Sequence, residues 1–510
     1  MVKQNFPKFF VSTAIPYTNS DPHIGFAMEL IIADVLVRFL RNSGKEVFFS
    51  TGVDQHGQKN KISAIEKGVL VTEFVEEKAN KFLELAEKLN ISFTKFVRTT
   101  DPAHKLASKE LWKGNFDNGL IYKGRYSGLY CVGCEEYKSE KDLVDGKCPD
   151  HQKEPIFLDS ENYFFKLSSF SEKITNLIDT EKILVLPRSR KNEMLNFCKD
   201  GLEDFSISRS IDQLDWGIEV PNDESQVMYV WFDALTNYIS ACGFPNDLES
   251  FQKWWLDEKT YKIHIIGKGI HRFHLAYWPG MLIGAGFPTQ NETFIHGFVT
   301  SGGMKMSKSI GNVVDPFSLI EKFGEDPVRW FFSSQGSLYE DIDFTYDRFF
   351  SVYESDLRKG LGNILNRLIS IAKKCDFSTD FTYENLDQKT REVIYDSDLL
   401  EKIAENYFLN YDYKGVTDLS KKIVQKINQY FDIEKLWEKP SKEISGVVKA
   451  FGRALARIFY FLNPIIPKSS IKALFKLYKF GFLDEGEEAL IKGFNLENMI
   501  YDNLLFPKID

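Results

Sequence analysis

The sequence predicts an α/β protein in which a doubly wound parallel sheet is interrupted by an insertion and followed by an all-helical domain. Residues 9–13 and 46–51 are predicted as buried strands, and an apolar-periodic helix from about 24 to 42 separates them, which is typical of a βαβ unit. Between 116 and 225 the sequence changes to short strands and turns around closely spaced cysteines. Beyond residue 350 apolar residues recur at three- and four-residue spacing, which indicates a helix bundle.

The remaining elements follow the same patterns in chain order. The sheet resumes with strands at 263–267 and 294–300. The predicted bundle helices are 357–374, 399–408, 416–430 and 444–462, and Pro467 begins a further element. We therefore expect five segments: the first half of the sheet domain (1–115), the insertion (116–225), the second half of the sheet domain (226–302), a loop and connecting region (303–350), and the helical domain (351–510).

Composition limits the class of protein. A chain of 510 residues is too long for one hydrophobic core, and 43% hydrophobic with 27% charged residues is ordinary for a globular enzyme. The first ten residues carry no charged-then-apolar leader, and no uncharged apolar run approaches ~18 residues. We therefore expect a cytoplasmic protein with no membrane partner. The net charge of −9 disfavours a broadly basic nucleic-acid-binding protein, so any RNA would have to meet local basic patches.

A cluster of cysteines predicts a metal site inside the insertion. The spacing Cys131-x2-Cys134, thirteen residues, Cys148-x2-His151 fits a closed tetrahedral Cys₃His zinc site. Because no ligand position remains for water, the zinc would be structural and would stabilise a small lobe with little core of its own. The alternative is three unrelated thiols and a surface histidine.

Two short motifs far apart in the sequence suit triphosphate chemistry. His23-Ile24-Gly25-Phe26 follows the first strand and opens the first helix, where free backbone N–H groups and the helix dipole favour an anion. Gly25 lacks a Cβ, so a flat ligand such as an adenine base could pack against the backbone. Lys305-Met306-Ser307-Lys308-Ser309, preceded by two glycines, predicts a mobile loop that closes over a pyrophosphate leaving group.

The two motifs resemble the signatures of class I aminoacyl-tRNA synthetases, and the surrounding sequence resembles the methionyl-tRNA synthetase family. Four further segments match that family in the expected order: Ala14-Ile15-Pro16-Tyr17, Gly52-Val53-Asp54-Gln55-His56-Gly57, Tyr229-Val230-Trp231-Phe232-Asp233-Ala234, and Phe273-His274 through Trp278-Pro279. With the helical region, the resemblance covers essentially the whole chain. It implies a Rossmann-type catalytic domain, an insertion with zinc, a stem-contact region after the lysine loop, and an anticodon-binding bundle.

The resemblance also implies the activity and its partners. ATP and L-methionine would give methionyl-adenylate and pyrophosphate, and the methionyl group would pass to the 3′ end of tRNA(Met), the initiator tRNA included. The catalytic residues would be His23, Lys305 and Lys308. ATP would be bound with Mg²⁺ by His23, Gly25, Phe26, Lys305, Ser307 and Lys308. The protein would act as a monomer.

Substrate selection is assigned to two further groups of residues. Asp54, at a strand end, is the candidate for the ammonium group of the amino acid, and a methionine thioether calls for an aromatic and apolar pocket. The resemblance places these residues in that pocket: Ala14, Ile15, Tyr17, Trp231, Ala234, Tyr238, Phe273, His274 and Trp278. Asn363 and Arg367, four residues apart on one helix face, and Trp437 would read the anticodon by edge contacts and stacking. The alternative for each aromatic residue is ordinary core.

Three positions depart from the family pattern. Phe26 stands where histidine is usual, and a hydrocarbon ring cannot donate a hydrogen bond to phosphate. Gly269 stands where aspartate is common, and Leu235 where proline is often found. Charge stabilisation in the transition state would then depend on His23, the helix N-terminus, Mg²⁺ and the lysine loop.

Several rival functions share some of these features. A synthetase for isoleucine, valine or leucine would need a large editing insertion, for which 116–225 has no room. A cysteine enzyme should hold zinc against its substrate thiol rather than inside the insertion. A tRNA-binding paralogue without catalysis would not need Lys308 and His23, and a simple nucleotidylyltransferase would not need the helix bundle.

Overall fold

The computed structural model describes residues 2–131, 136–138, 140, 143–149, 152–306, 312–377, 383–492 and 504–509. It divides into two compact units. The first contains Met1–Pro22, Lys45–Glu87 and Ser92–His296, and the second contains His23–Gly44, Lys88–Ile91 and Gly297–Asp510.

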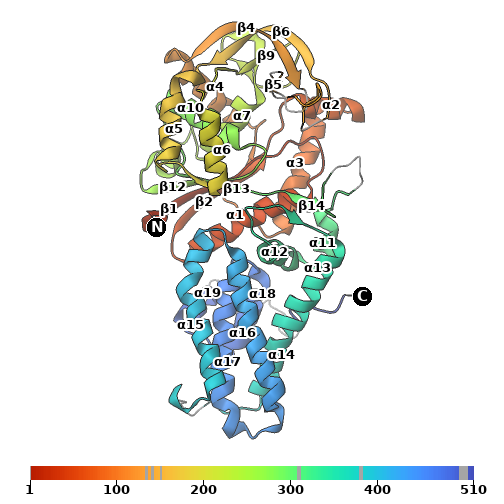
Figure 1. Cartoon of the computed structure of the whole chain (residues 1–510), viewed down its shortest axis with the longest axis vertical. Helices are drawn as coiled ribbons and strands as arrows, with labels where there is room; N and C mark the ends of the chain where they lie inside the picture. The colour runs from red at the N-terminus through yellow and green to blue at the C-terminus, as the bar shows by residue number, and fades with distance from the viewer. Residues whose placement is uncertain are drawn as a thin grey trace. The chain divides into compact units, whose positions relative to one another are not determined.

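A six-stranded parallel sheet forms the centre of the first unit, with strand order β3-β2-β1-β12-β13-β7 (Figure 1). Its strands are β1 (Lys8–Thr13), β2 (Glu46–Val53), β3 (Lys95–Arg98), β7 (Leu184–Leu186), β12 (Thr260–Gly267) and β13 (Glu292–His296). The register places Val11 between Phe49 and Ile263. Nearly every residue of β1, β2 and β12 is buried, which explains why these strands are continuous apolar runs rather than alternating ones. The predicted doubly wound parallel sheet is confirmed.

Helices of the first unit lie between these strands along the chain. They are α2 (Gln58–Lys67), α3 (Val71–Lys88), α4 (Pro102–Asp117), α5 (Ser171–Asp179), α6 (Arg188–Cys198), α7 (Val230–Leu235), α8 (Asn237–Ala241), α9 (Leu248–Phe251) and α10 (Trp278–Gly284). One continuous hydrophobic cluster joins α4, α7, α8 and α10 to the sheet, and it includes Trp112, Phe232, Tyr238 and Trp278.

The predicted insertion contains two small antiparallel sheets, but part of it belongs to the central sheet. The small sheets have the orders β5-β4-β6-β8 and β10-β11-β9. Their strands are β4 (Ile121–Cys131), β5 (Glu136–Lys138), β6 (Ile156–Phe165), β8 (Phe205–Ser206), β9 (Ser208–Ser210), β10 (Glu219–Val220) and β11 (Asp223–Met228). In contrast, β7 pairs in parallel with β13 and forms an edge of the central sheet. The sequence does not predict β7, because a three-residue strand is too short to show a periodic signal, and the boundaries of the insertion at 116–225 stay a prediction.

The second unit combines α1 (Ile24–Asn42), a small sheet and the helical domain. The small sheet consists of β14 (Val299–Ser301), β15 (Met304–Lys305) and β16 (Ile342–Asp343). The helices are α11 (Pro316–Phe323), α12 (Glu325–Ser334), α13 (Tyr346–Val352), α14 (Asn363–Ala372), α15 (Gln388–Leu409), α16 (Tyr413–Glu434), α17 (Ser441–Leu462), α18 (Pro467–Tyr478) and α19 (Glu485–Lys492). Within the bundle α15, α16 and α17 run alongside one another (Figure 1), which confirms the predicted all-helical domain.

A buried ion pair holds α1 in this second unit. The guanidinium of Arg329, on α12, lies 2.6 Å from a carboxylate oxygen of Asp34, and neither side chain is exposed. Arg329 also donates to the backbone carbonyls of Ile465, Pro464 and Leu89, so its buried donors are used. These contacts fix α1, whose first turn carries the His23 motif.

One predicted strand is two strands. The run 294–300 is split between β13 and β14, with Gly297 between them. A Cβ at Gly297 would lie 2.0 Å from the backbone carbonyl oxygen of Glu340, so only glycine permits this close approach of two backbones. Residues with strand propensity continue through the break, which is why the pattern shows one strand.

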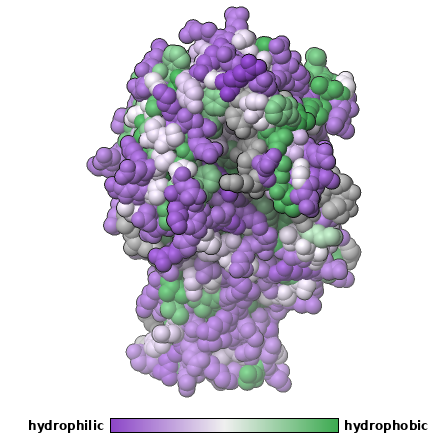
Figure 2. Space-filling model, turned by 45° about the horizontal axis from the view of Figure 1, so that its top comes forward, coloured by the Kyte–Doolittle hydropathy of each residue, from purple (hydrophilic) through white to green (hydrophobic). Residues whose placement is uncertain are grey.

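No helix among the described residues is long and apolar enough to cross a bilayer. The face shown in Figure 2 is mainly hydrophilic.

Candidate active site

The first motif forms the N-cap of α1. His23 is exposed and has an extended backbone, and its Nδ1 accepts a hydrogen bond from the backbone N–H of Gly25 at 3.1 Å. Because Nδ1 is the acceptor, the proton of the neutral imidazole lies on Nε2. His23 can therefore donate from Nε2 to an anion at the helix N-terminus, where the dipole of α1 also favours negative charge.

The absence of a Cβ at Gly25 leaves space for the imidazole of the capping histidine. A Cβ at this position would lie 2.9 Å from Cε1 and 3.0 Å from Nδ1 of His23. The same Cβ would lie 3.9 Å from the terminal methyl carbon of Met306. Since Met306 belongs to the second motif, the structure brings the two predicted triphosphate motifs together within the second unit.

Phe26 is buried, with 7% of its side chain exposed. Its backbone N–H donates to the carbonyl of His23 at 3.0 Å, which continues the first turn of α1. The Phe26 side chain is thus packed inside the protein, and its contact with ATP stays a prediction.

The second motif begins on a short hairpin that an aspartate stabilises. Gly302 and Gly303 connect β14 to β15 with φ of +61° and +74°, a conformation that favours glycine. Asp343 Oδ1 accepts from the backbone N–H of Gly303 at 2.7 Å and from the hydroxyl of Thr300 at 2.8 Å. The N–H of Gly303 holds the pKa of Asp343 below its usual value. Sequence reasoning missed Asp343, which lies forty residues beyond the hairpin.

The lysine motif is only partly described. The backbone of Lys305 pairs with Thr300 in the hairpin. Ser307 and Lys308 lie outside the described residues, so their predicted contacts with the triphosphate are not tested.

Asp54 follows β2 and is held against the end of β1. Its N–H donates to the carbonyl of Pro16 at 2.8 Å, and its backbone forms a parallel bridge with Tyr17. The Asp54 carboxylate is 3% exposed, and its Oδ1 accepts from the backbone N–H of His56 at 3.1 Å and the hydroxyl of Thr99 at 3.4 Å. The carboxylate is thus oriented by the protein, as an ammonium ligand should be.

The predicted pocket aromatics lie in one cluster of the first unit. The rings of Trp231 and Phe273 stack with centroids 3.8 Å apart and planes 5° from parallel. Trp278 and Tyr238 are buried at 0% and 1% exposure. These half-buried residues pack against the same hydrophobic cluster: Ala14, Tyr17, Trp231 and Phe273. Ile15 is also half-buried, Ala234 is buried, and Leu235 keeps an apolar side chain in the cluster.

A neutral histidine supplies the polar part of this cluster. The Nδ1 of His274 lies 2.9 Å from the carbonyl of Ile270, so Nδ1 carries the proton and donates. Its Nε2 lies 2.6 Å from the hydroxyl of Tyr238 and accepts from it. Burial lowers the pKa of His274 to about 4, which keeps the imidazole neutral near pH 7.

A second neutral histidine, which the sequence analysis did not identify, contacts the aromatic cluster. The Nε2 of His264 accepts from the indole N–H of Trp278 at 3.2 Å, and its Nδ1 lies 2.7 Å from the hydroxyl of Ser12. The ring of Tyr238 lies 4.0 Å from that of His264, centroid to centroid. Burial holds the pKa of His264 well below its usual value. The available signal was a histidine inside an otherwise apolar strand.

The predicted anticodon residues come from two elements of the second unit, α14 and the short 3-10 helix Leu436–Glu438. Arg367, on α14, donates to Asn428 Oδ1 at 3.1 Å and to Asp432 Oδ1 at 2.7 Å, both on α16. Its guanidinium carbon lies 5.8 Å from the ring centroid of Trp437, which is 46% exposed. Asn363, at the start of α14, is exposed. The structure therefore joins Arg367 and Trp437 on one surface of the bundle, although their role remains a prediction.

The predicted zinc site is half described. Cys134 and His151 lie outside the described residues. Cys131, at the end of β4, and Cys148, after the Val144–Lys147 bridge, are 2% and 0% exposed. Among the described residues no group of three or more His, Cys, Asp or Glu side chains is arranged to hold a metal. The zinc site therefore stays a prediction.

The strand order, the capping histidine at the first βα turn and the lysine hairpin are features of class I aminoacyl-tRNA synthetases. The family model described as tRNA synthetases class I (M) matches residues 9–155 and 142–369. The chain belongs to this family, the methionine group of the class I tRNA synthetases.

Individual relatives match over most of the chain. A methionine–tRNA ligase of Nostoc sp. is 38% identical over 91% of this chain and 88% of its own length. The chloroplastic/mitochondrial methionine–tRNA ligase of Arabidopsis thaliana is 39% identical over 84% of this chain and 70% of its own length.

A solved structure extends the likeness to the fold. Mycobacterium tuberculosis methionyl-tRNA synthetase in complex with methionyl-adenylate superposes with a TM-score of 0.85 and 33% identity. The match covers 92% of this chain and 93% of that chain.

Proposed function

We propose that the chain activates L-methionine with ATP to give methionyl-adenylate and pyrophosphate, and then transfers methionine to the 3′ end of tRNA(Met). The observation that carries this proposal is the match with relatives named methionine–tRNA ligase over 91% of the chain. The stacked and buried aromatic cluster around His274 supports it, because a thioether needs polarizable and apolar surroundings.

Adenylate formation requires positioning and charge stabilisation rather than proton transfer. A carboxylate oxygen of methionine attacks the α-phosphorus of ATP, and the bond from that phosphorus to the pyrophosphate oxygen breaks. His23 would donate from Nε2 to a phosphate oxygen as negative charge develops. Lys305, Ser307 and Lys308 would bind the triphosphate tail and neutralise the leaving pyrophosphate. Mg²⁺, bound with ATP, would supply further neutralisation of the phosphates.

Methionine would be bound by charge at one end and by aromatic faces at the other. The carboxylate of Asp54 would accept the ammonium group, since Oδ1 is already fixed by two donors. Trp231, Phe273 and Tyr238 would surround the side chain. Because His274 accepts from Tyr238 and donates to a backbone carbonyl, its polar atoms are used, and the methionine side chain would meet only weak hydrogen-bonding groups.

Transfer to tRNA needs a second recognition surface, which we place on the helix bundle. Asn363, Arg367 and Trp437 would contact the anticodon, with Trp437 stacking on a base and the two polar side chains reaching base edges. A ribose hydroxyl of the terminal adenosine then attacks the carbonyl carbon of the adenylate, and AMP leaves. The exposed ring of Trp437 beside Arg367 supports this assignment.

The proposal includes one structural zinc ion held by Cys131, Cys134, Cys148 and His151. The burial of both described thiols supports it. It also includes action as a monomer in the cytoplasm, which light scattering on the purified chain and cell fractionation would test.

ATP–pyrophosphate exchange measured with each of the twenty amino acids tests the central proposal. We expect exchange with L-methionine, and rates lower by orders of magnitude with isoleucine, valine, leucine and cysteine. Preferential exchange with another amino acid would assign the chain to another synthetase. Loss of exchange with all twenty, in protein that binds tRNA(Met), would indicate a paralogue without catalysis.

A further inference from the structure

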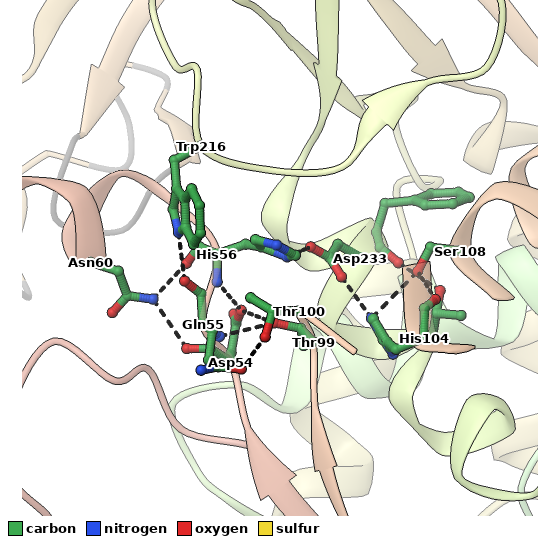
Figure 3. Close-up of polar contacts among 12 residues, drawn as sticks. Asp54, Gln55, His56, Asn60, Thr99, Thr100, His104, Ser108, Trp216 and Asp233 are labelled. Carbon is green, nitrogen blue, oxygen red and sulfur yellow. Dashed lines mark hydrogen bonds and ion pairs between the residues drawn. The ribbon is translucent and has the colours of Figure 1, made fainter. Parts of the chain in front are cut away.

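Asp233 lies at the centre of a buried hydrogen-bond network in the first unit (Figure 3). It stands on α7 with no exposed surface, and its two carboxylate oxygens face two different histidines. Oδ2 lies 2.6 Å from Nδ1 of His56, and Oδ1 lies 2.7 Å from Nε2 of His104. Both histidines are also buried, at 2% and 1% exposure.

The network determines which ring nitrogens of His56 and His104 carry protons. Burial alone would raise the pKa of Asp233, but the electrostatic interaction with His56 and the hydrogen bond from His104 outweigh burial and lower it to about 2. The ionised carboxylate can only accept, so Nδ1 of His56 and Nε2 of His104 both carry protons and donate.

The network does not have the geometry of a metal site, although two histidines and a carboxylate often bind metals. Each ring nitrogen that faces Asp233 lies at hydrogen-bond distance from one of its oxygens, which leaves no space for an ion between them. Within the described part of the chain no group of such side chains is arranged to hold a metal.

One end of the network reaches the candidate ammonium ligand. The backbone N–H of His56 donates to Oδ1 of Asp54 at 3.1 Å. The side-chain amide of Asn60 donates to the carbonyls of both His56 and Asp54, at 2.7 and 3.1 Å. The Asp233 contact on the ring and the Asn60 contact on the backbone therefore both anchor His56, whose backbone N–H donates to the Asp54 carboxylate.

The other end reaches the elements that carry the aromatic cluster. Asp233 lies between Trp231 and Ala234 on the short helix α7. Nδ1 of His104 lies 2.9 Å from the hydroxyl of Ser240, directly after Tyr238 and Ile239 on α8. Asp233 thus connects the loop after β2 with α7, and through His104 with α8, two of the helices that bear predicted methionine contacts.

We propose that His56, Asp233 and His104 are positioning residues, which set the Asp54 carboxylate at a fixed place relative to the Trp231 face for amino-acid binding. The inference rests on the proposed function of Asp54 and Trp231. Burial of a charge is costly, and well-packed apolar residues would stabilise a core at least as well. A carboxylate with both oxygens occupied instead imposes one geometry on three separate segments.

The test uses substitutions that keep or remove a single donor. Asparagine places its amide nitrogen near the position of histidine Nδ1, and glutamine near Nε2. His56→Asn and His104→Gln should therefore keep most of the function, whereas His56→Leu, His104→Leu and Asp233→Asn should not. For the last three we expect KM for L-methionine in ATP–pyrophosphate exchange to rise roughly 10- to 100-fold, as for a lost hydrogen bond to a charged group. KM for ATP should stay within about twofold.

A matched control and a double variant separate positioning from general stability. Tyr261→Phe removes a buried hydrogen bond to Glu292 in the same sheet without touching the network, so it should lower Tm and leave KM for methionine unchanged. If Asp233 acts through Asp54, the effect of Asp233→Asn on KM should largely disappear in an Asp54→Asn background.

The outcomes distinguish a failure of the ammonium assignment of Asp54 from a failure of the positioning role of the network. If Asp54→Asn leaves KM for methionine unchanged, the ammonium assignment in the proposed function is wrong. If Asp54→Asn raises KM but the effect of Asp233→Asn simply adds to it, or the leucine and amide variants behave alike, the network is only part of the core and the inference is wrong.

Discussion

The guanidinium of Arg367 lies beside the ring of Trp437, with its carbon 5.8 Å from the ring centroid, and the carboxylate of Asp432 holds it there. An exposed indole supported by a cation that is itself fixed by a carboxylate and an amide is a rigid surface for an unpaired base. The arrangement separates anticodon reading from the chemistry at His23, because no residue of the adenylation motifs takes part in it.

Trp437→Ala should therefore impair charging of tRNA and leave amino-acid activation intact. Loss of base stacking is worth ~1–3 kcal/mol, or roughly 5- to 150-fold in aminoacylation of tRNA with the anticodon CAU. Discrimination against tRNAs with a changed first anticodon base should also fall, since the lost contact is to a base rather than a phosphate. Pyrophosphate exchange and aminoacylation assays, run side by side, measure both effects.

The exposed Tyr395 on α15 provides a control for that experiment. Tyr395→Ala removes a similar aromatic surface from the bundle and should leave charging unchanged. The contrary result is that Trp437→Ala lowers aminoacylation of tRNAs with the CAU anticodon and with altered anticodons by the same factor. That result would show that Trp437 supports the bundle and does not read a base.

Lys308→Ala should lower the rate of adenylation with little change in methionine affinity. A lysine that stabilises the leaving pyrophosphate acts in the transition state, so its loss should reduce kcat about 100-fold. The control is Lys322→Ala, an exposed lysine at the end of α11, which should have no effect. A parallel loss of methionine binding and rate would point to a disturbed fold.

Gly25→Ala should damage the capping geometry of His23. The new Cβ would lie 2.9 Å from Cε1 of His23, which forces the imidazole away from the Gly25 N–H. We expect a fall in kcat for exchange by about 10-fold or more, because a catalytic donor displaced by a fraction of an ångström loses much of its effect. Methionine KM and Tm should change little. A variant with normal kcat would show that the cap is not needed for catalysis.

The sequence predicts the parallel sheet, α1 and the bundle because their signals are local. Apolar periodicity predicts α1 at about 24–42, and a continuous buried run predicts the strand at 46–51; the structure has them at Ile24–Asn42 and Glu46–Val53. Candidate site residues come from motif resemblance, and the structure adds their partners.

What could not be predicted depends on contacts between distant segments. Asp343 supports the lysine hairpin, and His264 accepts from Trp278, yet neither lies in a motif. The split at Gly297 also depends on the backbone of Glu340, more than forty residues away. Such partners have no periodic or compositional signal, because only the folded chain brings them together.

One equivalent of zinc per chain should be found in protein purified without chelator. Replacement of Cys148 by serine removes a thiolate ligand that is fully buried, and should release the metal and loosen the inserted lobe. The control is Cys198→Ser, which changes a buried thiol on α6 outside the predicted site. Elemental analysis and limited proteolysis measure both results, and full zinc retention in Cys148→Ser would remove this residue from the ligand set.

The neutral histidines of the aromatic cluster should make the fold sensitive to acid. Burial lowers the pKa of His274 from 6.5 to about 4, so the unfolded chain binds a proton at this residue more readily than the folded chain does. The stabilising contribution is therefore complete above pH ~6.5 and is lost progressively as the pH falls toward 4, by an amount on the order of 3 kcal/mol.

Comparison with His274→Gln isolates this contribution. Glutamine can still accept from Tyr238 but does not titrate, so the variant should lose less stability than the wild type between pH 7 and pH 4.5. Urea unfolding followed at both pH values gives the two differences. Parallel losses in wild type and variant would mean that the folded chain protonates His274 as readily as the unfolded chain does, and that burial does not lower its pKa.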